Sequence, residues 1–142
     1  MQIQRTVETT ASPAAVFAYL SDFTTTEQWD PGTVRTTRVS GDGGVGTTYH
    51  NVSKFAGRET ELTYEVTEHE PDRRFGLRGE NKTVIARDTM EITPSGSGSR
   101  MTYTADFKFR GIAKYAAPLL APAFKKLGDE AEQGLHEAFA KL

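Results

Sequence analysis

Apolar residues recur at a helical period through residues 112–142. They follow one another in steps of three or four from Ala113 to Leu142, with charged side chains between them, which predicts one amphipathic helix. Pro118 and Pro122 fall inside this pattern. Because proline removes a backbone donor and crowds the carbonyl four residues earlier, we expect a kink there and a regular helix from about Pro122. An amphipathic helix is not stable alone in water, so this one must pack on the preceding part of the chain.

Most of that preceding part alternates between apolar and polar residues, which is typical of half-buried strands. We expect strands at residues 2–9, 33–39, 47–55, 58–69, 74–78, 83–93 and 101–109. Two short helical segments follow the first strand: one begins at Ser12-Pro13, with Ser12 as its N-cap, and the other covers Thr26 to Trp29. Residues 94–99 predict a flexible hairpin loop. The order predicts an α+β fold with an antiparallel sheet, one face solvated and the other covered by the last helix.

The apolar stripe of that helix is made largely of small residues. The small residues in or beside it are Ala113, Ala117, Gly128, Ala131, Gly134 and Ala138. Glycine inside a helix costs roughly 0.5–1 kcal/mol relative to alanine, so the two glycines need a reason. One explanation is close packing of the helix backbone on the sheet, and the other is a cavity left by the missing side-chain volume.

The composition limits the class of protein. A chain of 142 residues is expected to form one domain, residues 1–142, and its hydrophobic fraction of 37% and charged fraction of 25% are ordinary for a soluble globular protein. No apolar run approaches the ~20 residues of a membrane span, and residues 1–5 show no signal-peptide core. We therefore expect a cytoplasmic protein without stable membrane insertion. A net charge of −2 argues against a nucleic-acid partner, and the sequence leaves the oligomeric state open.

Several motifs of cofactor and catalytic sites are absent or lack their context. The chain has no cysteine, which excludes disulfides, thiolate metal sites and cysteine nucleophiles. Residues 41–46 fit the G-x-G-x-x-G pattern, but a strand follows them where a dinucleotide site needs a helix, so we interpret them as a hairpin turn. His50, His69 and His136 are far apart in sequence, and no G-x-S-x-G elbow exists. We expect no metal and no cofactor.

One acidic residue lies on an apolar strand face. Asp88 shares its parity with Val84, Ala86, Met90 and Ile92. A carboxylate there is unfavourable unless it is paired or solvated. Three structural explanations stay open, namely a bulge that reverses the register, a strand end, or a salt bridge to Arg5. The functional explanation is a polar group at a cavity wall that orients a ligand or acts as a general acid or base with a raised pKa.

Three short segments resemble one protein superfamily. They are residues 11–17 (ASPAAVF), Asp22-Phe23 leading to Trp29-Asp30-Pro31, and residues 45–49 (VGTTY). The chain is similar over its whole length to the START and birch-pollen-allergen superfamily, also called SRPBCC proteins, and within it to the polyketide cyclase/dehydrase and lipid-transport branch. The resemblance implies a helix-grip fold, in which a curved seven-stranded antiparallel sheet wraps around a long C-terminal helix and encloses an apolar cavity. Functions in the family range from lipid carriage to ring cyclisation, so membership does not decide function.

The function that we expect is non-covalent binding of a hydrophobic or aromatic small molecule, such as a lipid or polyketide-like compound, between sheet and helix. The first alternative is a polyketide cyclase or dehydratase with Asp88 as its candidate catalytic residue, and the second is a protein-interaction module with a vestigial cavity. Tyr64 and Tyr103 are the expected polar groups of the site. The residues that we expect at the cavity are Trp29, Tyr49, Tyr64, Phe75, Asp88, Met90, Tyr103, Phe107, Leu120, Phe124 and Gly128.

Overall fold

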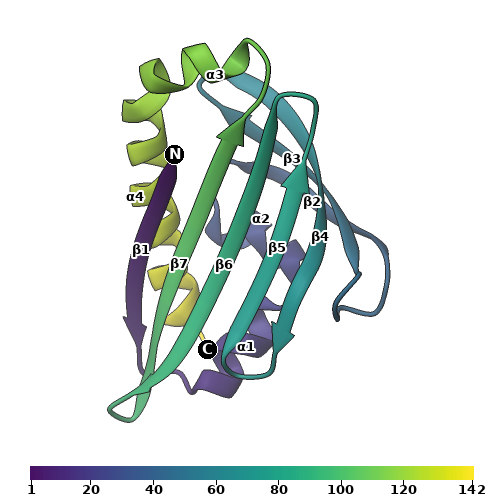
Figure 1. Ribbon diagram of the computed structural model, residues 1–142. Helices are drawn as coiled ribbons and strands as arrows, with labels where there is room; N and C mark the ends of the chain where they lie inside the picture. The colour runs from purple at the N-terminus through teal and green to yellow at the C-terminus, as the bar shows by residue number, and fades with distance from the viewer.

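A computed structural model describes all residues, 1–142, and contains one seven-stranded antiparallel sheet (Figure 1). The strands are β1 (Gln2–Thr9), β2 (Thr33–Ser40), β3 (Thr48–Phe55), β4 (Arg58–Glu70), β5 (Arg74–Glu80), β6 (Val84–Ser95) and β7 (Gly98–Phe109). Their order across the sheet is β1-β7-β6-β5-β4-β3-β2. Hairpins join the consecutive strands from β2 to β7, and β1 pairs with β7 at one edge.

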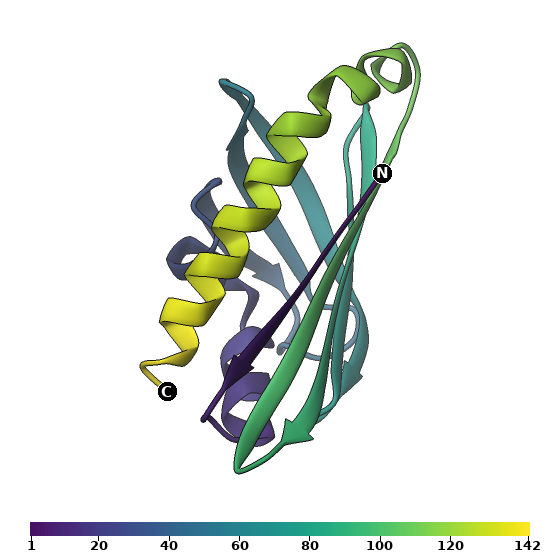
Figure 2. The ribbon, with the colours of Figure 1, turned by 90° about the vertical axis from the view of Figure 1, so that its left-hand side faces the viewer.

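Helical segments precede and follow this run of hairpins. Between β1 and β2 lie α1 (Pro13–Leu20), the 3₁₀ turn η1 (Phe23–Thr25) and α2 (Thr26–Trp29). After β7 come α3 (Ala113–Ala116), the 3₁₀ turn η2 (Ala117–Leu120) and α4 (Ala121–Phe139). Figure 2 shows α4 crossing the open side of the curved sheet, with α1 near its C-terminal end and α3 at the opposite end. The predicted α+β helix-grip architecture is confirmed.

Local signals set several of the observed boundaries. The hydroxyl of Ser12 accepts a hydrogen bond from the backbone N–H of Ala15 at 3.2 Å, as an N-cap does. Pro118 lies in η2 and Pro122 in the first turn of α4, so the expected interruption falls at the prolines and the regular helix begins at Ala121.

Residues 94–99 form the expected hairpin, but the prediction that all six residues belong to its loop was wrong. The pairing of β6 with β7 continues to Ser95 and Gly98, which leaves only Gly96 and Ser97 in the turn, and Gly96 takes a positive φ of 58°. A Cβ on Gly98 would lie 2.0 Å from the carbonyl oxygen of Thr9. Glycine at this position therefore allows β7 to begin close beside the end of β1. The serine and glycine content of this segment is typical of a loop, although the segment forms the ends of two strands.

Both glycines of α4 lie where the helix backbone packs closely on its neighbours. A Cβ on Gly128 would lie 2.7 Å from Cγ2 of Ile3 on β1, and one on Gly134 would lie 1.8 Å from the carbonyl oxygen of Trp29 in α2. Close packing is therefore the reason for both glycines. The helix rests on the β1 edge of the sheet and on α2, and it spans the space between these supports.

The packed core fills one end of that space. Its fully buried members include Val16, Leu20, Tyr49, Phe75, Leu77, Met90, Met101 and Leu135. These side chains come from α1, from the middle of the sheet and from the C-terminal half of α4, which meet at this end. Nothing comparable to α1 covers the sheet near α3, and there the interior stays open.

Candidate functional site

A cavity of about 510 Å³ lies between the sheet and α4. It is mainly apolar, since 18 of its 31 lining residues are hydrophobic. The helical side contributes Ala113, Ala116, Leu120, Phe124, Leu127, Gly128 and Ala131, and the facing strand β7 contributes Tyr103, Ala105, Phe107 and Phe109. Cavities of roughly 300–1,000 Å³ with apolar walls and a few polar groups are the usual form of small-molecule sites.

Eight of the residues that we expected at a cavity line this one. They are Trp29, Tyr64, Asp88, Tyr103, Phe107, Leu120, Phe124 and Gly128. Three of the apolar side chains form a cluster at its wall, with the ring of Phe124 centred 5.0 Å from that of Phe107 and 4.5 Å from that of Phe55. A role for these residues in binding is a proposal and is taken up below.

The prediction was wrong for Tyr49, Phe75 and Met90, which lie in the packed core and not at the cavity wall. Phe75 and Met90 are cross-strand partners, and the ring of Phe75 packs edge-on against Phe17 of α1 at 6.4 Å. Strand parity identifies the face on which a side chain lies but not its position along the interior. α1 covers Phe75 and Met90, and Phe23 of η1 packs against the ring of Tyr49 at 5.6 Å, so these helical segments decide that the three are core residues.

The polar end of the cavity is formed by Asp88, Tyr103 and Trp29. The Tyr103 hydroxyl donates a hydrogen bond to Oδ2 of Asp88 at 3.1 Å, while Oδ1 of Asp88 has no partner. The indole Nε1 of Trp29 is also buried without a partner. The ring of Trp29 meets that of Tyr103 edge-to-face at 5.6 Å, which places the three side chains together.

Burial raises the pKa of Asp88 from its ordinary 3.8 to about 7, although the hydrogen bond from Tyr103 opposes this increase. Only 5% of the residue is exposed. The negative charge of Asp30 adds to the increase. Burial also raises the pKa values of the Tyr103 and Tyr64 hydroxyls well above their usual value. These phenols are therefore neutral donors at physiological pH, beside a carboxyl group that titrates near neutrality.

The structural explanations considered for Asp88 do not hold. Residues 84–95 pair with β7 without a register shift, so Asp88 lies in mid-strand and not at a bulge or a strand end. Arg5 instead contacts Asp129 at 3.0 Å and Glu132 at 3.4 Å, both on the outer side of α4. No cation pairs with Asp88, which leaves its carboxyl group facing the cavity.

Asp30 and Gly79 also shape this end of the cavity, although the sequence did not predict either of them as a site residue. Asp30 lines the cavity, and its carboxylate accepts hydrogen bonds from the N–H of Gly32 at 3.0 Å and the hydroxyl of Thr33 at 2.9 Å. A Cβ on Gly79 would lie 2.6 Å from the ring of Tyr64, so glycine lets this ring lie across β5. The alternation of apolar and polar residues could not identify either one. Asp30 lies in a loop, and the effect of Gly79 depends on Tyr64, its partner on the neighbouring strand.

Other missed lining residues did have a signal. Leu62 shares its parity with Tyr64, and Phe109 shares that of Phe107. Asn51 lies on the inward parity of β3, where its side-chain amide donates to the hydroxyl of Thr36 at 2.8 Å. The inward parity of their strands was therefore enough to predict that these three residues face the interior.

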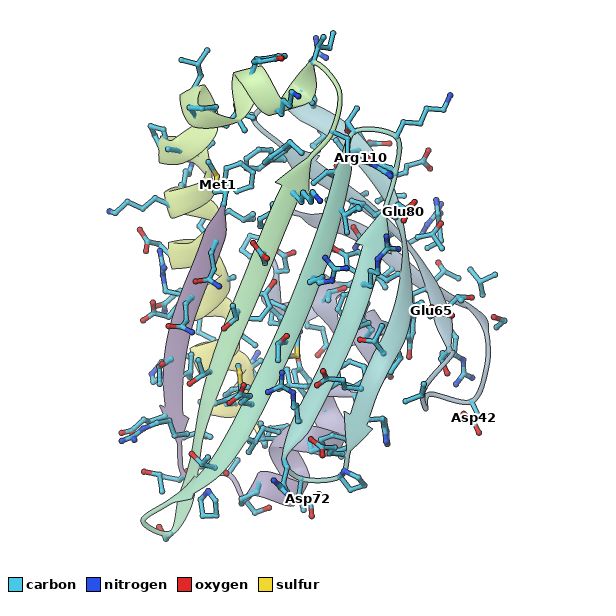
Figure 3. All side chains as sticks on the ribbon, in the orientation of Figure 1. Met1, Asp42, Glu65, Asp72, Glu80 and Arg110 are labelled. Atoms are coloured by element: carbon cyan, nitrogen blue, oxygen red, sulfur yellow. The ribbon has the colours of Figure 1, made fainter.

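Polar and charged residues surround the opening of the cavity near α3. Lys54 near the end of β3 and Arg58 at the start of β4 line it, together with Asn81 and Thr83 of the β5–β6 connection. Figure 3 shows Arg110 and Glu80 at this end of the sheet, where their side chains form an ion pair at 3.4 Å. The cations of the cavity therefore lie at its opening, and its polar end carries carboxyl and hydroxyl groups.

The remaining candidate motifs lie outside the cavity. Residues 41–46 join β2 to β3, which confirms the hairpin interpretation of the glycine-rich segment. His50 contacts Glu61 at 3.2 Å on the sheet, and His69 packs edge-on against Phe17 at 5.0 Å. The structure brings no three histidine, aspartate or glutamate side chains together as a metal site would. It also contains no helix with the length and apolar character required to cross a bilayer.

Comparison with known proteins gives one family and many structures of the same shape. A family model described as polyketide cyclase / dehydrase and lipid transport matches residues 1–140. The structure is similar to the Zhui aromatase/cyclase from Streptomyces sp. R1128 (TM-score 0.83, 14% identity, 97% of this chain and 92% of that one). It is also similar to a START superfamily protein from Mycobacterium smegmatis (TM-score 0.79, 14% identity, 97% and 96%).

A third similar structure contains two domains. The di-domain ARO/CYC BexL from the BE-7585A biosynthetic pathway matches with a TM-score of 0.75 and 8% identity, over 100% of this chain and 50% of that one. No curated protein matches the sequence. At these identities the structural likeness shows a common fold and nothing about substrate.

Proposed function

Because the chain belongs to the polyketide cyclase/dehydrase and lipid transport family, we propose that it binds a hydrophobic or aromatic small molecule in the cavity between the sheet and α4. The observation that carries this proposal is the cavity itself, about 510 Å³ with mainly apolar walls and one polar end. Such a site supplies affinity by burial of apolar surface and orientation by a few polar contacts.

The size of the cavity allows an estimate of the affinity for an apolar ligand. A ligand that buries ~300 Å² of apolar surface would gain roughly 7 kcal/mol at about 25 cal/mol per Å², before the losses of freedom on association. The walls that would supply this gain are the aromatic side chains around Phe124, together with Leu120 and Leu127 of the helical side. Because about 8 kcal/mol corresponds to 1 μM and association losses reduce the gain, we expect dissociation constants in the micromolar range at best, with polar contacts and further buried surface adding to the affinity.

Two adjacent leucines provide the test. Leu120 lines the cavity, whereas Leu119 is 82% exposed and does not line it. The probe is N-phenyl-1-naphthylamine, an uncharged dye that fluoresces strongly in apolar surroundings. We expect wild type to bind it, Leu120→Trp to weaken binding about tenfold or more by filling the cavity, and Leu119→Trp to change it less than twofold. Failure of wild type to bind, or equal weakening by both variants, would contradict the proposal. Native mass spectrometry of the purified protein would identify a co-purifying ligand.

A cyclase or dehydratase is the second candidate function. The observation that favours it is Asp88, whose pKa of about 7 and contact with the Tyr103 hydroxyl suit a general acid or base. If the protein turns over a model polyketide, Asp88→Asn should reduce the rate ~10²-fold or more, and the wild-type rate should titrate near pH 7. Because we rank binding first, we expect no turnover by either form and probe binding by Asp88→Asn within a few-fold of wild type.

The third alternative, a protein-interaction module with a vestigial cavity, has less support. A filled interior with an exposed apolar patch would favour that function, whereas a cavity of about 510 Å³ stays open beside the packed core.

A further inference from the structure

Two buried polar atoms at the inner end of the cavity have complementary hydrogen-bonding capacity and no partner. They are Nε1 of Trp29, which can only donate, and Oδ1 of Asp88. Both residues line the cavity, and they are 2% and 5% exposed. We propose that this end is a hydroxyl-recognition site, and that the ligand is an uncharged apolar molecule that enters with a hydroxyl group leading. This inference rests on the proposed binding function and adds the chemical class of the ligand.

The hydrogen-bonding capacity of the two atoms suits a hydroxyl group in particular. A hydroxyl accepts from one partner and donates to another, which matches the indole N–H and the free carboxyl oxygen. Tyr103 holds Asp88 through Oδ2, so Oδ1 remains for the ligand. An apolar ligand end would leave both buried atoms unpaired, and each unpaired group costs roughly as much as a lost hydrogen bond.

The charges at this end argue against an acidic ligand. The titratable groups that face Asp88 are Asp30, Tyr64 and Tyr103, none of which is a cation. The guanidinium of Arg5 is held on the outside by Asp129 and Glu132, and the nearest lining cations are at the opening. A carboxylate brought to the polar end would meet Asp88 and Asp30 with no compensating charge.

The test compares three ligands that share a naphthalene body: 2-naphthol, 2-methylnaphthalene and 2-naphthoate. Each is titrated against the wild-type protein in competition with N-phenyl-1-naphthylamine. We expect 2-naphthol to bind about tenfold more tightly than 2-methylnaphthalene, and 2-naphthoate to bind more weakly than either. Trp29→Phe and Asp88→Leu should each reduce the preference for 2-naphthol to about twofold or less, while the affinity for 2-methylnaphthalene stays within about threefold.

Thr60→Val is the matched control. Thr60 also lines the cavity but lies on β4 four residues from Tyr64, which places it ~13 Å along the strand toward the opening. Its loss of a hydroxyl should leave the preference unchanged. Equal wild-type affinity for 2-naphthol and 2-methylnaphthalene would overturn the hydroxyl site but leave the binding function standing. Binding of none of the ligands, nor of the dye, would overturn both, and the wild-type titrations decide this even if a variant fails to fold.

A separate observation concerns the outer face of the segment that covers the opening. Ile112, Tyr115 and Leu119 are 87%, 73% and 82% exposed, and their spacing of three and four places them on one side of α3 and η2. The next residue after each of these, Ala113, Ala116 and Leu120, lines the cavity from a neighbouring side of the same segment. The segment therefore has an apolar outer side besides the side that it presents to the cavity, which is unusual for a surface helix.

Cations without an ion-pair partner lie at the same end of the molecule as this apolar face. They are Lys54, Arg58, Lys82, Lys108 and Lys114, none of which forms a salt bridge in the structure. Exposed apolar side chains among basic residues fit the surface of an anionic bilayer, to which each nearby Lys or Arg adds about 1 kcal/mol. We infer that α3 and η2 form a docking surface for anionic membranes, which would place the cavity opening at the lipid surface.

Cosedimentation with vesicles tests this surface. We expect binding to vesicles of phosphatidylcholine with 30% phosphatidylserine, less binding to phosphatidylcholine alone, and loss of binding at high salt. The double variant Tyr115→Ser with Leu119→Ser should reduce binding at least fivefold. Val39→Ser, at a position that is 65% exposed near the β2–β3 loop, should not. Absence of binding to the anionic vesicles, or an equal loss in both variants, would refute the inference and leave an acidic protein partner as the explanation of the surface.

Discussion

The pH dependence of stability tests the environment assigned to Asp88 without any knowledge of the ligand. Its pKa is about 7 in the folded protein and 3.8 in its ordinary state. Between these values the folded state keeps a proton that the unfolded state has lost. Stability is therefore highest below about pH 4 with respect to this group, and it falls as pH rises through about 7. At about 1.4 kcal/mol per pKa unit, the full loss is roughly 4 kcal/mol, a large part of the stability of an ordinary domain.

Asp88→Asn removes this titration and keeps the shape of the side chain. We expect the free energy of unfolding of wild type to fall relative to the variant by roughly 4 kcal/mol between pH 4 and pH 8, with most of the change below pH 7. Urea unfolding at half-unit steps of pH measures this difference. The contributions of the surface ion pairs are common to both proteins and cancel. Asp106→Asn, on the exposed face of the neighbouring β7, is the control for removal of a carboxylate from the sheet. Parallel curves for wild type and Asp88→Asn would show that Asp88 is solvated and would refute its burial beside Tyr103.

Three further substitutions test the packing of the helices. Gly134→Ala should lower the melting temperature even though alanine favours helix by ~1 kcal/mol, because its Cβ would lie 1.8 Å from the carbonyl oxygen of Trp29; a stabilised variant in thermal unfolding would contradict this contact. Gly128→Leu should cost typically 1–3 kcal/mol in urea unfolding through overpacking against Ile3, and a neutral result would mean that the helix has free space there. Ser12→Ala should cost ~1 kcal/mol by removing the N-cap of α1, with Ser12→Asp expected to restore stability.

The element pattern could be derived from the sequence because most strands carry their own alternation of apolar and polar residues. The predicted start of α1 at Ser12-Pro13 and the span of β1 agree with the structure, since capping and parity are local properties. The error at residues 94–99 has a local cause as well, because a run of serine and glycine suits a loop and a tight hairpin equally.

The candidate site was only partly accessible to the same reasoning. Parity placed Asp88 and Tyr103 on the inner face, but it also placed Phe75 and Met90 there. Whether an inward side chain meets a cavity or a packed core depends on which helix covers it. The periodicity of a strand contains no information about that helix. Asp30 could not be identified at all, since a loop residue acquires its position from the chain on either side.

The sequence by itself therefore determined the order of the elements, their inner faces and the unusual acid on one of them. The tertiary structure decided where the interior is filled and where it is open. Gly128 and Gly134 let α4 rest on β1 and α2, and the helix bridges the curved sheet between these supports. The cavity arises from this long-range arrangement, because the depth of the space under a helix depends on sheet curvature and on contacts between distant segments, which local patterns do not encode.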